Sequence, residues 1–301
     1  EICACLVGSE MCIRDSEKQP GLLLPNLVHD NRDPKVFRHE ASGAYIMTLY
    51  LAGNDFAIFR SPDLIHWEQT QQLTLPEAWE CPDLFPLTVE GEEKWVFWSA
   101  DSFYFVGSFD GWRFTPEQPR RTAYANRIGY AAQTFAREEG RVLSVAWLRL
   151  PNAGRRFTGV MSVPMELTLA RDAEGYALRM HPCRELSGAM KPVSGTDAPE
   201  APWVLRADVP ADAGSVCVSF PGGELTLDMD AGTGRFGETS LSFAPGKALP
   251  LLLIADYAVF ELYLGSGAVY APEQNLSSSL AGPVSVTGAG GRIPFTLSEV
   301  D

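Results

Sequence analysis

Short apolar runs separated by turn-forming residues constrain the fold of this chain more than any other feature. From about Leu22 to Leu186, runs of four to eight aromatic and β-branched residues alternate with Gly, Pro, Asn and Asp, a pattern typical of β-strands joined by tight turns. No segment of this part keeps the i, i+3, i+4, i+7 apolar spacing of an amphipathic helix over eleven residues. The sequence therefore predicts an all-β fold. The clearest predicted strands are Ala44–Leu51, Phe56–Arg60, Lys94–Ser99, Phe103–Ser108 and Val142–Leu148.

Two stretches of this half resemble each other. Phe56–Glu68 reads FAIFRSPDLIHWE and Phe103–Phe114 reads FYFVGSFDGWRF, so each is a strand, then Ser-x-Asp, then a short turn into an aromatic residue. The two copies begin 47 residues apart. A repeat of this length with several strands per unit is typical of β-propeller blades. The pattern alone also allows two similar hairpins of a β-sandwich.

The C-terminal part has a different pattern. Lys191–Pro202 (KPVSGTDAPEAP) is polar and rich in proline, which predicts a linker. Ala207–Asp301 alternates apolar and polar residues in short runs, which predicts an antiparallel β-sandwich of about 100 residues. Leu251–Leu264 is long enough for a helix, but its β-branched and aromatic content favours a hairpin that turns near Asp256.

The first residues of the chain differ from the rest. Residues 6–16, LVGSEMCIRDS, translate back into a transposon-end adaptor used in short-read sequencing libraries. We therefore expect residues 1–16 to be an adaptor-like artefact and the natural chain to begin near Glu17, within a gene whose start lies upstream. A genuine, unusual N-terminus is the alternative. A signal peptide fits poorly, because the segment has neither a basic start nor an apolar core of 7–15 residues.

The composition of the chain limits the classes of binding partner and cofactor that we expect. The chain carries 38 Asp and Glu against 24 Lys and Arg, a net charge of −14, which argues against nucleic acid or an anionic membrane as the main partner. A neutral sugar is compatible with this charge. Three of the six cysteines lie in the adaptor-like segment and the others are scattered, so no disulfide framework, metal site or other cofactor is predicted. Cellular location and oligomeric state stay open.

Two carboxylates lie in sequence contexts that are suited to catalysis. Asp33 precedes Pro34, which disfavours the α region for it. Glu80 lies between Trp79 and Cys81, where partial desolvation would raise its pKa and suit a general acid. Paired carboxyl groups with separated pKa values are what glycoside hydrolysis requires. Taken singly, an Asp before Pro is also a common turn former, and a Glu beside Trp a common surface charge.

These motifs resemble signatures of glycoside hydrolase family 32, the family of the invertases, levanases, inulinases and sucrose-6-phosphate hydrolases. RDPKVF and ECPDLF are similar to its second and third motifs, and three further segments follow in the family's order. Ile128-Gly129 stands where the family usually has Asp-Phe, and Met165 where Arg is common. The matching segments are Arg32–Phe37, Glu80–Phe85, Gly129–Phe135, Phe157–Leu169 and Ala255–Leu264.

The resemblance implies a five-bladed β-propeller, with its first blade or more missing from this chain, followed by a β-sandwich. The expected boundaries are 17–186 for the partial propeller, 187–202 for the linker and 203–301 for the sandwich. The implied reaction is retaining hydrolysis of terminal β-D-fructofuranosyl bonds in sucrose or fructans, so the expected partner is a sugar or oligosaccharide.

The resemblance also implies roles for individual residues. Glu80 would be the general acid/base and Asp33 the transition-state stabiliser. Arg32, Cys81, Trp98 and Asp101 are the predicted substrate-binding residues, although a solvated loop acid is an equally compatible interpretation of Asp101.

The family's nucleophile is an Asp in a Trp-Met-Asn-Asp-Pro-Asn-Gly-type motif well upstream of Asp33. That motif is absent from this sequence, and Asp30 in His-Asp-Asn does not match it. A retaining mechanism needs the nucleophile, so we predict that the 301-residue chain is inactive. The alternatives are a family 43-like glycosidase acting on arabinan or xylan, and a non-catalytic fructan-binding or structural protein.

Overall fold

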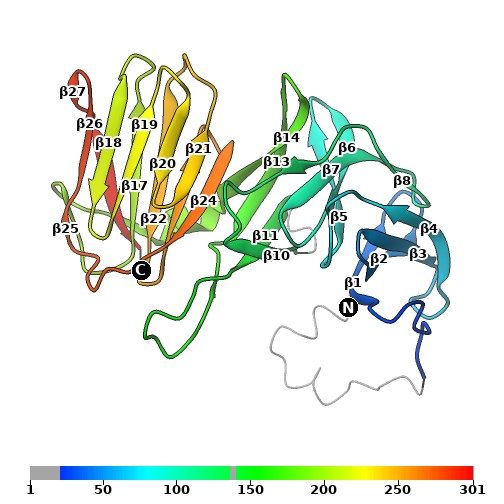
Figure 1. Cartoon of the computed structure of the whole chain (residues 1–301). Helices are drawn as coiled ribbons and strands as arrows, with labels where there is room; N and C mark the ends of the chain where they lie inside the picture. Colours follow the sequence, from blue (N-terminus) through cyan, green and yellow to red (C-terminus); the bar gives the residue numbers. More distant parts are fainter. Residues whose placement is uncertain (1–20, 136–139, 301) are drawn as a thin grey trace.

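The computed structural model describes residues 21–135 and 140–300, and it is all-β apart from one short 3-10 helix, η1 (Arg184–Ala189), within those residues (Figure 1). The adaptor-like segment, residues 1–16, lies outside the described residues. Three antiparallel sheets follow one another along the N-terminal half, and two larger sheets form the C-terminal half at the opposite end of the molecule (Figure 1). The prediction of an all-β fold is confirmed.

The three N-terminal sheets share one topology: the first strand lies at the edge of the sheet, and the main strands follow one another across it in sequence order. The first sheet contains β1 (Arg32–His39), β2 (Ala44–Ala52), β3 (Asp55–Ser61) and β4 (Glu68–Thr74). The second contains β5 (Asp83–Val89), β6 (Glu92–Trp98), β7 (Phe103–Phe109) and β8 (Phe114–Pro116), with β9 (Arg121–Thr122) beside β7. The third contains β10 (Gly129–Thr134), β11 (Val142–Leu148), β13 (Met165–Asp172) and β14 (Gly175–Pro182), with β12 (Val160–Met161) beside β11.

The sequence repeat corresponds to one structural unit in two successive sheets. The two copies form β3 and β7, the third strands of their sheets, and the turns that lead into β4 and β8. In both turns the Asp of Ser-x-Asp accepts backbone N–H bonds: Asp63 from Ile65 and His66 at 2.9 and 2.8 Å, and Asp110 from Trp112 and Arg113 at 2.8 and 2.7 Å. An Asp in this position closes a tight turn on its own backbone, which explains why the motif recurs.

The C-terminal half consists of two facing six-stranded antiparallel sheets. Along their strands, apolar residues on the facing sides alternate with exposed polar residues. The apolar residues form one buried cluster that includes Trp203, Leu253 and Phe236. The hairpin predicted over Leu251–Leu264 is confirmed, since its turn closes with a bond from Asp256 N to Val259 O of 2.9 Å. In sheet order, one sheet contains β15 (Met190–Pro192), β28 (Phe295–Val300), β17 (Trp203–Val209), β22 (Leu249–Ala255), β23 (Val259–Leu264) and β24 (Val269–Gln274). The other contains β21 (Thr239–Ser242), β20 (Thr233–Phe236), β19 (Gly223–Asp228), β18 (Ser215–Phe220), β26 (Ser285–Gly288) and β27 (Gly291–Arg292).

The segment predicted as a linker, 187–202, contributes strands of its own. β15 pairs with β28 at the edge of one sandwich sheet, and β16 (Asp197–Ala198) pairs with β25 (Gly282–Pro283). This segment is therefore packed against the sandwich along part of its length. The domain boundaries themselves stay a prediction.

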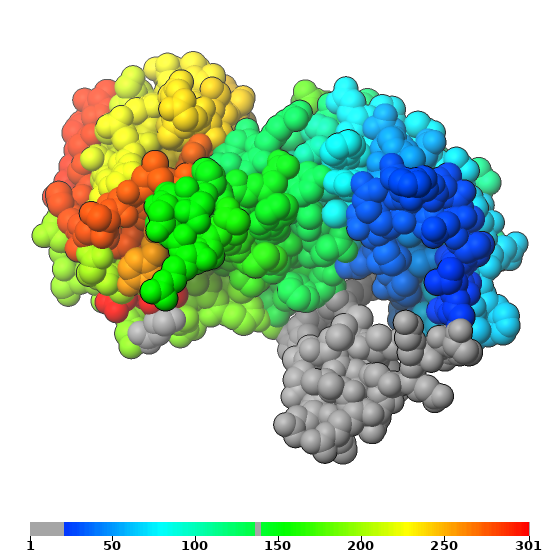
Figure 2. Space-filling model, turned by 60° about the horizontal axis from the view of Figure 1, so that its bottom comes forward, coloured from blue at the N-terminus to red at the C-terminus, as the bar shows by residue number. Residues whose placement is uncertain are grey.

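The two halves share a core. One buried cluster combines Leu148 and Met165 of the third sheet with Val204, Ile254 and Tyr270 of the sandwich. The loop after β11 lies against the strands around β24 (Figure 2), where Gln274 Nε2 donates to the Pro151 carbonyl at 2.8 Å. Burial of this shared apolar surface holds the halves together. Within the described residues, no helix is long and apolar enough to cross a membrane.

Candidate active site

Arg32, Glu80 and Tyr130 occupy equivalent positions in the three N-terminal sheets. Arg32 and Tyr130 lie where the first strand of their sheet begins, opposite a residue of the second strand, and Glu80 lies three residues before β5. Arg32 pairs with Tyr50 and Tyr130 with Trp147, while the carbonyl of Glu80 accepts a bond from Ala100 N at 3.1 Å. The same backbone position in three sheets therefore places a guanidinium, a carboxylate and a phenol together.

The residue after each of these three adopts a left-handed backbone. Asp33 has φ 58°, Cys81 has φ 43° and Ala131 has φ 50°, and Glu80 itself has φ 52°. Asp33 therefore avoids the right-handed α region, as Pro34 requires, but it is not extended. Left-handed non-glycine residues are unfavourable and persist where the surrounding structure fixes them, often at functional sites.

The Glu80 carboxylate is held from two sides. Arg32 Nη2 donates to Oε1 at 2.5 Å, and the Tyr130 hydroxyl donates to Oε2. Trp79 Nε1 in turn donates to the Tyr130 hydroxyl at 2.9 Å. The Glu80 side chain is 22% exposed, so it borders solvent and is open to a ligand.

Desolvation raises the pKa of Glu80, but the bonds from Tyr130 and Arg32 outweigh it, and the net pKa lies below its usual value. The raised pKa that we expected from the neighbouring Trp and Cys is therefore wrong for this state of the site. The two donors come from residues 50 and 48 positions away, which local sequence context does not reveal.

Asp33 is joined to the cluster of Arg32, Glu80 and Tyr130 through the backbone of Cys81. Cys81 N donates to Asp33 Oδ2 at 3.2 Å, and the Cys81 thiol lies 3.6 Å from the same oxygen. Arg32 Nε is 3.8 Å from Asp33 Oδ2, so this guanidinium contacts both carboxylates. Desolvation and then the charge of Asp33 raise the pKa of the Cys81 thiol to about 12, which keeps the thiol neutral.

Asp101 lies at the edge of this group. Its Oδ1 is 4.0 Å from Arg149 Nη2, and the Arg149 guanidinium stacks 4.0 Å from the centre of the Tyr130 ring. Trp147 makes an edge contact with Tyr130, with ring centres 6.2 Å apart, and is 44% exposed. Tyr130, Arg149 and Trp147 were not singled out from the sequence; the signal that pointed to Tyr130 was its place in GYAAQTF.

The prediction of Trp98 as a substrate-binding residue is wrong. Trp98 is 2% exposed and packs against Tyr104 and Tyr124 in the core, with ring centres 6.3 and 5.7 Å away. Side chains alternate along β6, but both of its faces are buried from Lys94 to Trp98, and Trp98 fills apolar space in the cluster that also contains Val96.

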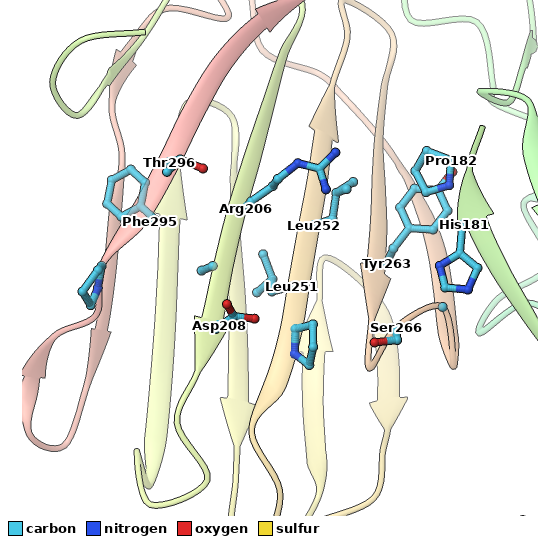
Figure 3. Close-up of a pocket in the computed structure, with 14 residues that line it drawn as sticks. His181, Pro182, Arg206, Asp208, Leu251, Leu252, Tyr263, Ser266, Phe295 and Thr296 are labelled. Carbon is cyan, nitrogen blue, oxygen red and sulfur yellow. The ribbon is translucent and has the colours of Figure 1, made fainter. Parts of the chain in front are cut away.

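A separate groove of about 680 Å³ lies on the sandwich, not at Glu80 (Figure 3). It crosses the outer face of β17, β22 and β28 and is bounded by His181 at the end of β14. Arg206 and Asp208 of β17 are among the residues that line it (Figure 3). None of the predicted site residues lines it. Among the described residues, no cluster of three or more His, Cys, Asp or Glu side chains is arranged to hold a metal ion.

Comparison with known proteins gives the family. Residues 11–182, more than half of the chain, match the domain described as "Glycosyl hydrolases family 32 N-terminal domain". The chain belongs to glycosyl hydrolase family 32. The match begins within the adaptor-like segment, so the match and that prediction differ over residues 11–16.

Individual relatives and solved structures are consistent with this family assignment. The chain is 31% identical to a levanase of Bacillus sp. (strain L7) over 58% of this chain and 22% of the levanase. It is 26% identical to a sucrose-6-phosphate hydrolase of Salmonella typhimurium over 78% of this chain and 58% of that enzyme. The exo-inulinase of Aspergillus awamori shares the fold, with a TM-score of 0.78 at 17% identity over 93% of this chain and 70% of that one. The chain thus spans only part of the length of these relatives.

Proposed function

We propose that this family 32 chain is built to cleave terminal β-D-fructofuranosyl bonds in sucrose or fructans with retention. The observation that carries the proposal is the carboxylate of Glu80 held between Arg32 and Tyr130, with Asp33 tied to the next peptide. The names of the relatives support the substrate class, since they include levanases, exo-inulinases and a sucrose-6-phosphate hydrolase. Two solved neighbours are described as complexes with fructosyl-erythritol and with sucrose.

In this mechanism Glu80 is the general acid/base. It gives a proton to the leaving oxygen and later takes one from water. Because Arg32 and Tyr130 lower its pKa in the free site, a turn of these donors toward the bound sugar would favour protonation of Glu80. Arg32 is placed for this exchange, since its guanidinium contacts both Glu80 and Asp33. Asp33 then stabilises the transition state by accepting hydrogen bonds from fructose hydroxyls.

The other predicted substrate contacts take supporting roles. Arg32 orients the sugar, and the Cys81 peptide N–H fixes Asp33. Asp101 acts through Arg149, which stacks on Tyr130. The exposed Trp147 ring offers an apolar face beside Tyr130, of the kind on which sugar rings pack.

We propose that the three N-terminal sheets are blades of a five-bladed propeller.

Retaining hydrolysis needs, besides the acid/base, a second carboxylate about 5–5.5 Å from it. The sequence has no motif of the Trp-Met-Asn-Asp-Pro-Asn-Gly type, so we infer that the 301-residue polypeptide by itself does not release fructose. Appreciable fructose release from the purified chain would contradict this inference.

The function is tested in the complete protein encoded by the gene, assayed on sucrose, levan, inulin and arabinan. Glu80→Gln is expected to lower hydrolysis by about 10²- to 10⁴-fold, the usual contribution of a general acid/base, while binding of the sugar is retained. Activity on arabinan alone would favour a family 43-like specificity. Sugar binding without hydrolysis by the unmodified protein would favour a fructan-binding protein.

A further inference from the structure

A second row of polar residues lies three positions after the first. Arg32, Glu80 and Tyr130 are followed at this spacing by Lys35, Asp83 and Gln133, where regular pairing resumes with the second strand of each sheet. The same local geometry therefore presents two rows of side chains, one at the carboxylates and one next to them. The second row plays no part in the mechanism above.

Lys35 and Asp83 of the second row, together with Thr134 beside Gln133, join the three sheets to one another. Asp83 Oδ2 accepts bonds from Thr134 N at 2.7 Å and Thr134 Oγ1 at 2.8 Å, and Lys35 Nζ lies 3.2 Å from the same oxygen. Lys35 Nζ also donates to the carbonyl of Thr134. Gln133 Nε2 donates to the carbonyl of Cys81 at 3.3 Å. One residue from each of β1, β5 and β10 is thus bound to the other two.

Burial shows that this cluster is not an ordinary surface ion pair. The Asp83 side chain is 1% exposed and that of Lys35 is 20% exposed. Among the described residues, Asp83 Oδ1 has no hydrogen-bond partner although it is buried. Such an oxygen is unfavourable, and a buried ion pair is weak support for stability compared with apolar packing. Fixing a geometry is the better-supported use of such a group.

We propose that Lys35, Asp83 and Thr134 form an inter-sheet clamp that holds Arg32 and Tyr130 at hydrogen-bonding distance from Glu80. The three are positioning residues, and their value for catalysis rests on the proposed function. Only Cys81 and Pro82 separate Glu80 from Asp83, and Pro82 has a fixed φ. A movement of β5 against β1 at the clamp is therefore passed on to Glu80.

The clamp is tested on the chain itself, without any assay of hydrolysis. The pKa of Glu80 is measured by NMR titration of ¹³C-labelled glutamate carboxyls, with its signal assigned through Glu80→Gln. Lys35→Met and Asp83→Asn are then compared. If the clamp sets geometry, both variants weaken the bonds from Arg32 and Tyr130, and both shift the Glu80 pKa upward.

The two variants separate geometry from simple charge. Loss of the Lys35 charge alone also raises the pKa of a nearby carboxyl, but loss of the Asp83 charge alone lowers it. An upward shift in Asp83→Asn therefore supports the clamp, and a downward shift or no shift overturns it. If Asp83→Asn does not fold, Thr134→Val removes one bond without changing charge. It is expected to give a smaller upward shift, and an unchanged pKa would overturn the proposal.

Lys94→Met is the matched control. Lys94 is also a largely buried lysine, bonded to Glu117 Oε2 at 2.7 Å, but its partners Glu92, Glu117 and Tyr176 are not residues of the site. This variant is expected to lose stability and to leave the Glu80 pKa unchanged. Because the readout does not depend on turnover, an inactive complete protein would count against the proposed function and leave the clamp standing.

Discussion

Asp33 Oδ2 accepts a hydrogen bond from the backbone N–H of Cys81 at 3.2 Å, so the two candidate carboxylates are joined through the peptide that follows Glu80. Asp33 comes from the first sheet and Cys81 from the start of the second. The distance between the carboxylates thus depends on how these sheets are held together, and it does not depend on a flexible loop.

Tyr130→Phe is expected to raise the pKa of Glu80. The Tyr130 hydroxyl stabilises the charged carboxylate, and its removal leaves Arg32 as the remaining donor while desolvation is unchanged. The measurement is the ¹³C titration of Glu80 in the chain. In the complete enzyme, the limb of the pH–rate profile that reports Glu80 should move to higher pH. Tyr176→Phe, which removes a hydroxyl bonded to Glu92 in another region, is the control and should leave Glu80 unchanged.

Stability is expected to fall as pH rises from about 4.5 to 7 because of Glu261. This carboxyl is fully buried, and burial raises its pKa from 4.5 to about 7 despite bonds from Tyr270, Val163 N and Tyr263. Tyr124, Cys183 and Asp256 are further titratable groups that influence the cluster. At Glu261 the folded state binds more protons than the unfolded state in this window, so the contribution of this group to stability is fully present below pH 4.5 and decreases by about 3 kcal/mol toward pH 7.

Urea unfolding at several pH values measures this effect. Glu261→Gln should remove this contribution to the slope, so that the difference from the unmodified chain changes with pH. The exposed Glu68→Gln should run parallel to the unmodified chain. A parallel curve for Glu261→Gln would contradict the prediction.

Cys81 is expected to resist alkylation in the folded chain. Burial and the charge of Asp33 raise its pKa to about 12, and the thiolate is the reactive form. Treatment with iodoacetamide at pH 8, followed by peptide mapping, should find Cys81 unmodified in buffer and modified in urea. Stoichiometric labelling in buffer would show that the thiol is more exposed or more acidic than this site implies.

Ile254→Ala is expected to destabilise the chain by about 2–5 kcal/mol, as for other buried aliphatic truncations. Ile254 is 4% exposed and lies in the core shared by the sandwich and the third sheet. Denaturant unfolding followed by circular dichroism gives the value. Val36→Ala, at a valine that is 42% exposed, is the control, and its free energy of unfolding should change by no more than about 0.5 kcal/mol.

The sequence predicted the all-β class, the turn of the Asp256 hairpin and the repeat, because each depends on residues close together in the chain. It also brought Asp33 and Glu80 forward through their motifs. It did not predict the direction of the Glu80 pKa, since Arg32 and Tyr130 reach it from other sheets. The prediction for Trp98 was wrong for a related reason: an aromatic run such as KWVFWS does not show that other elements cover both faces of its strand.

The recurrence of one backbone shape in three sheets has a practical consequence for protein engineering. Asp33, Cys81 and Ala131 are corresponding positions with left-handed φ, and only the third carries a plain methyl side chain. Ala131 already has the left-handed conformation that an Asp or Asn side chain tolerates. A polar side chain could therefore be introduced there with the backbone conformation that Asp33 and Cys81 have in the other two sheets.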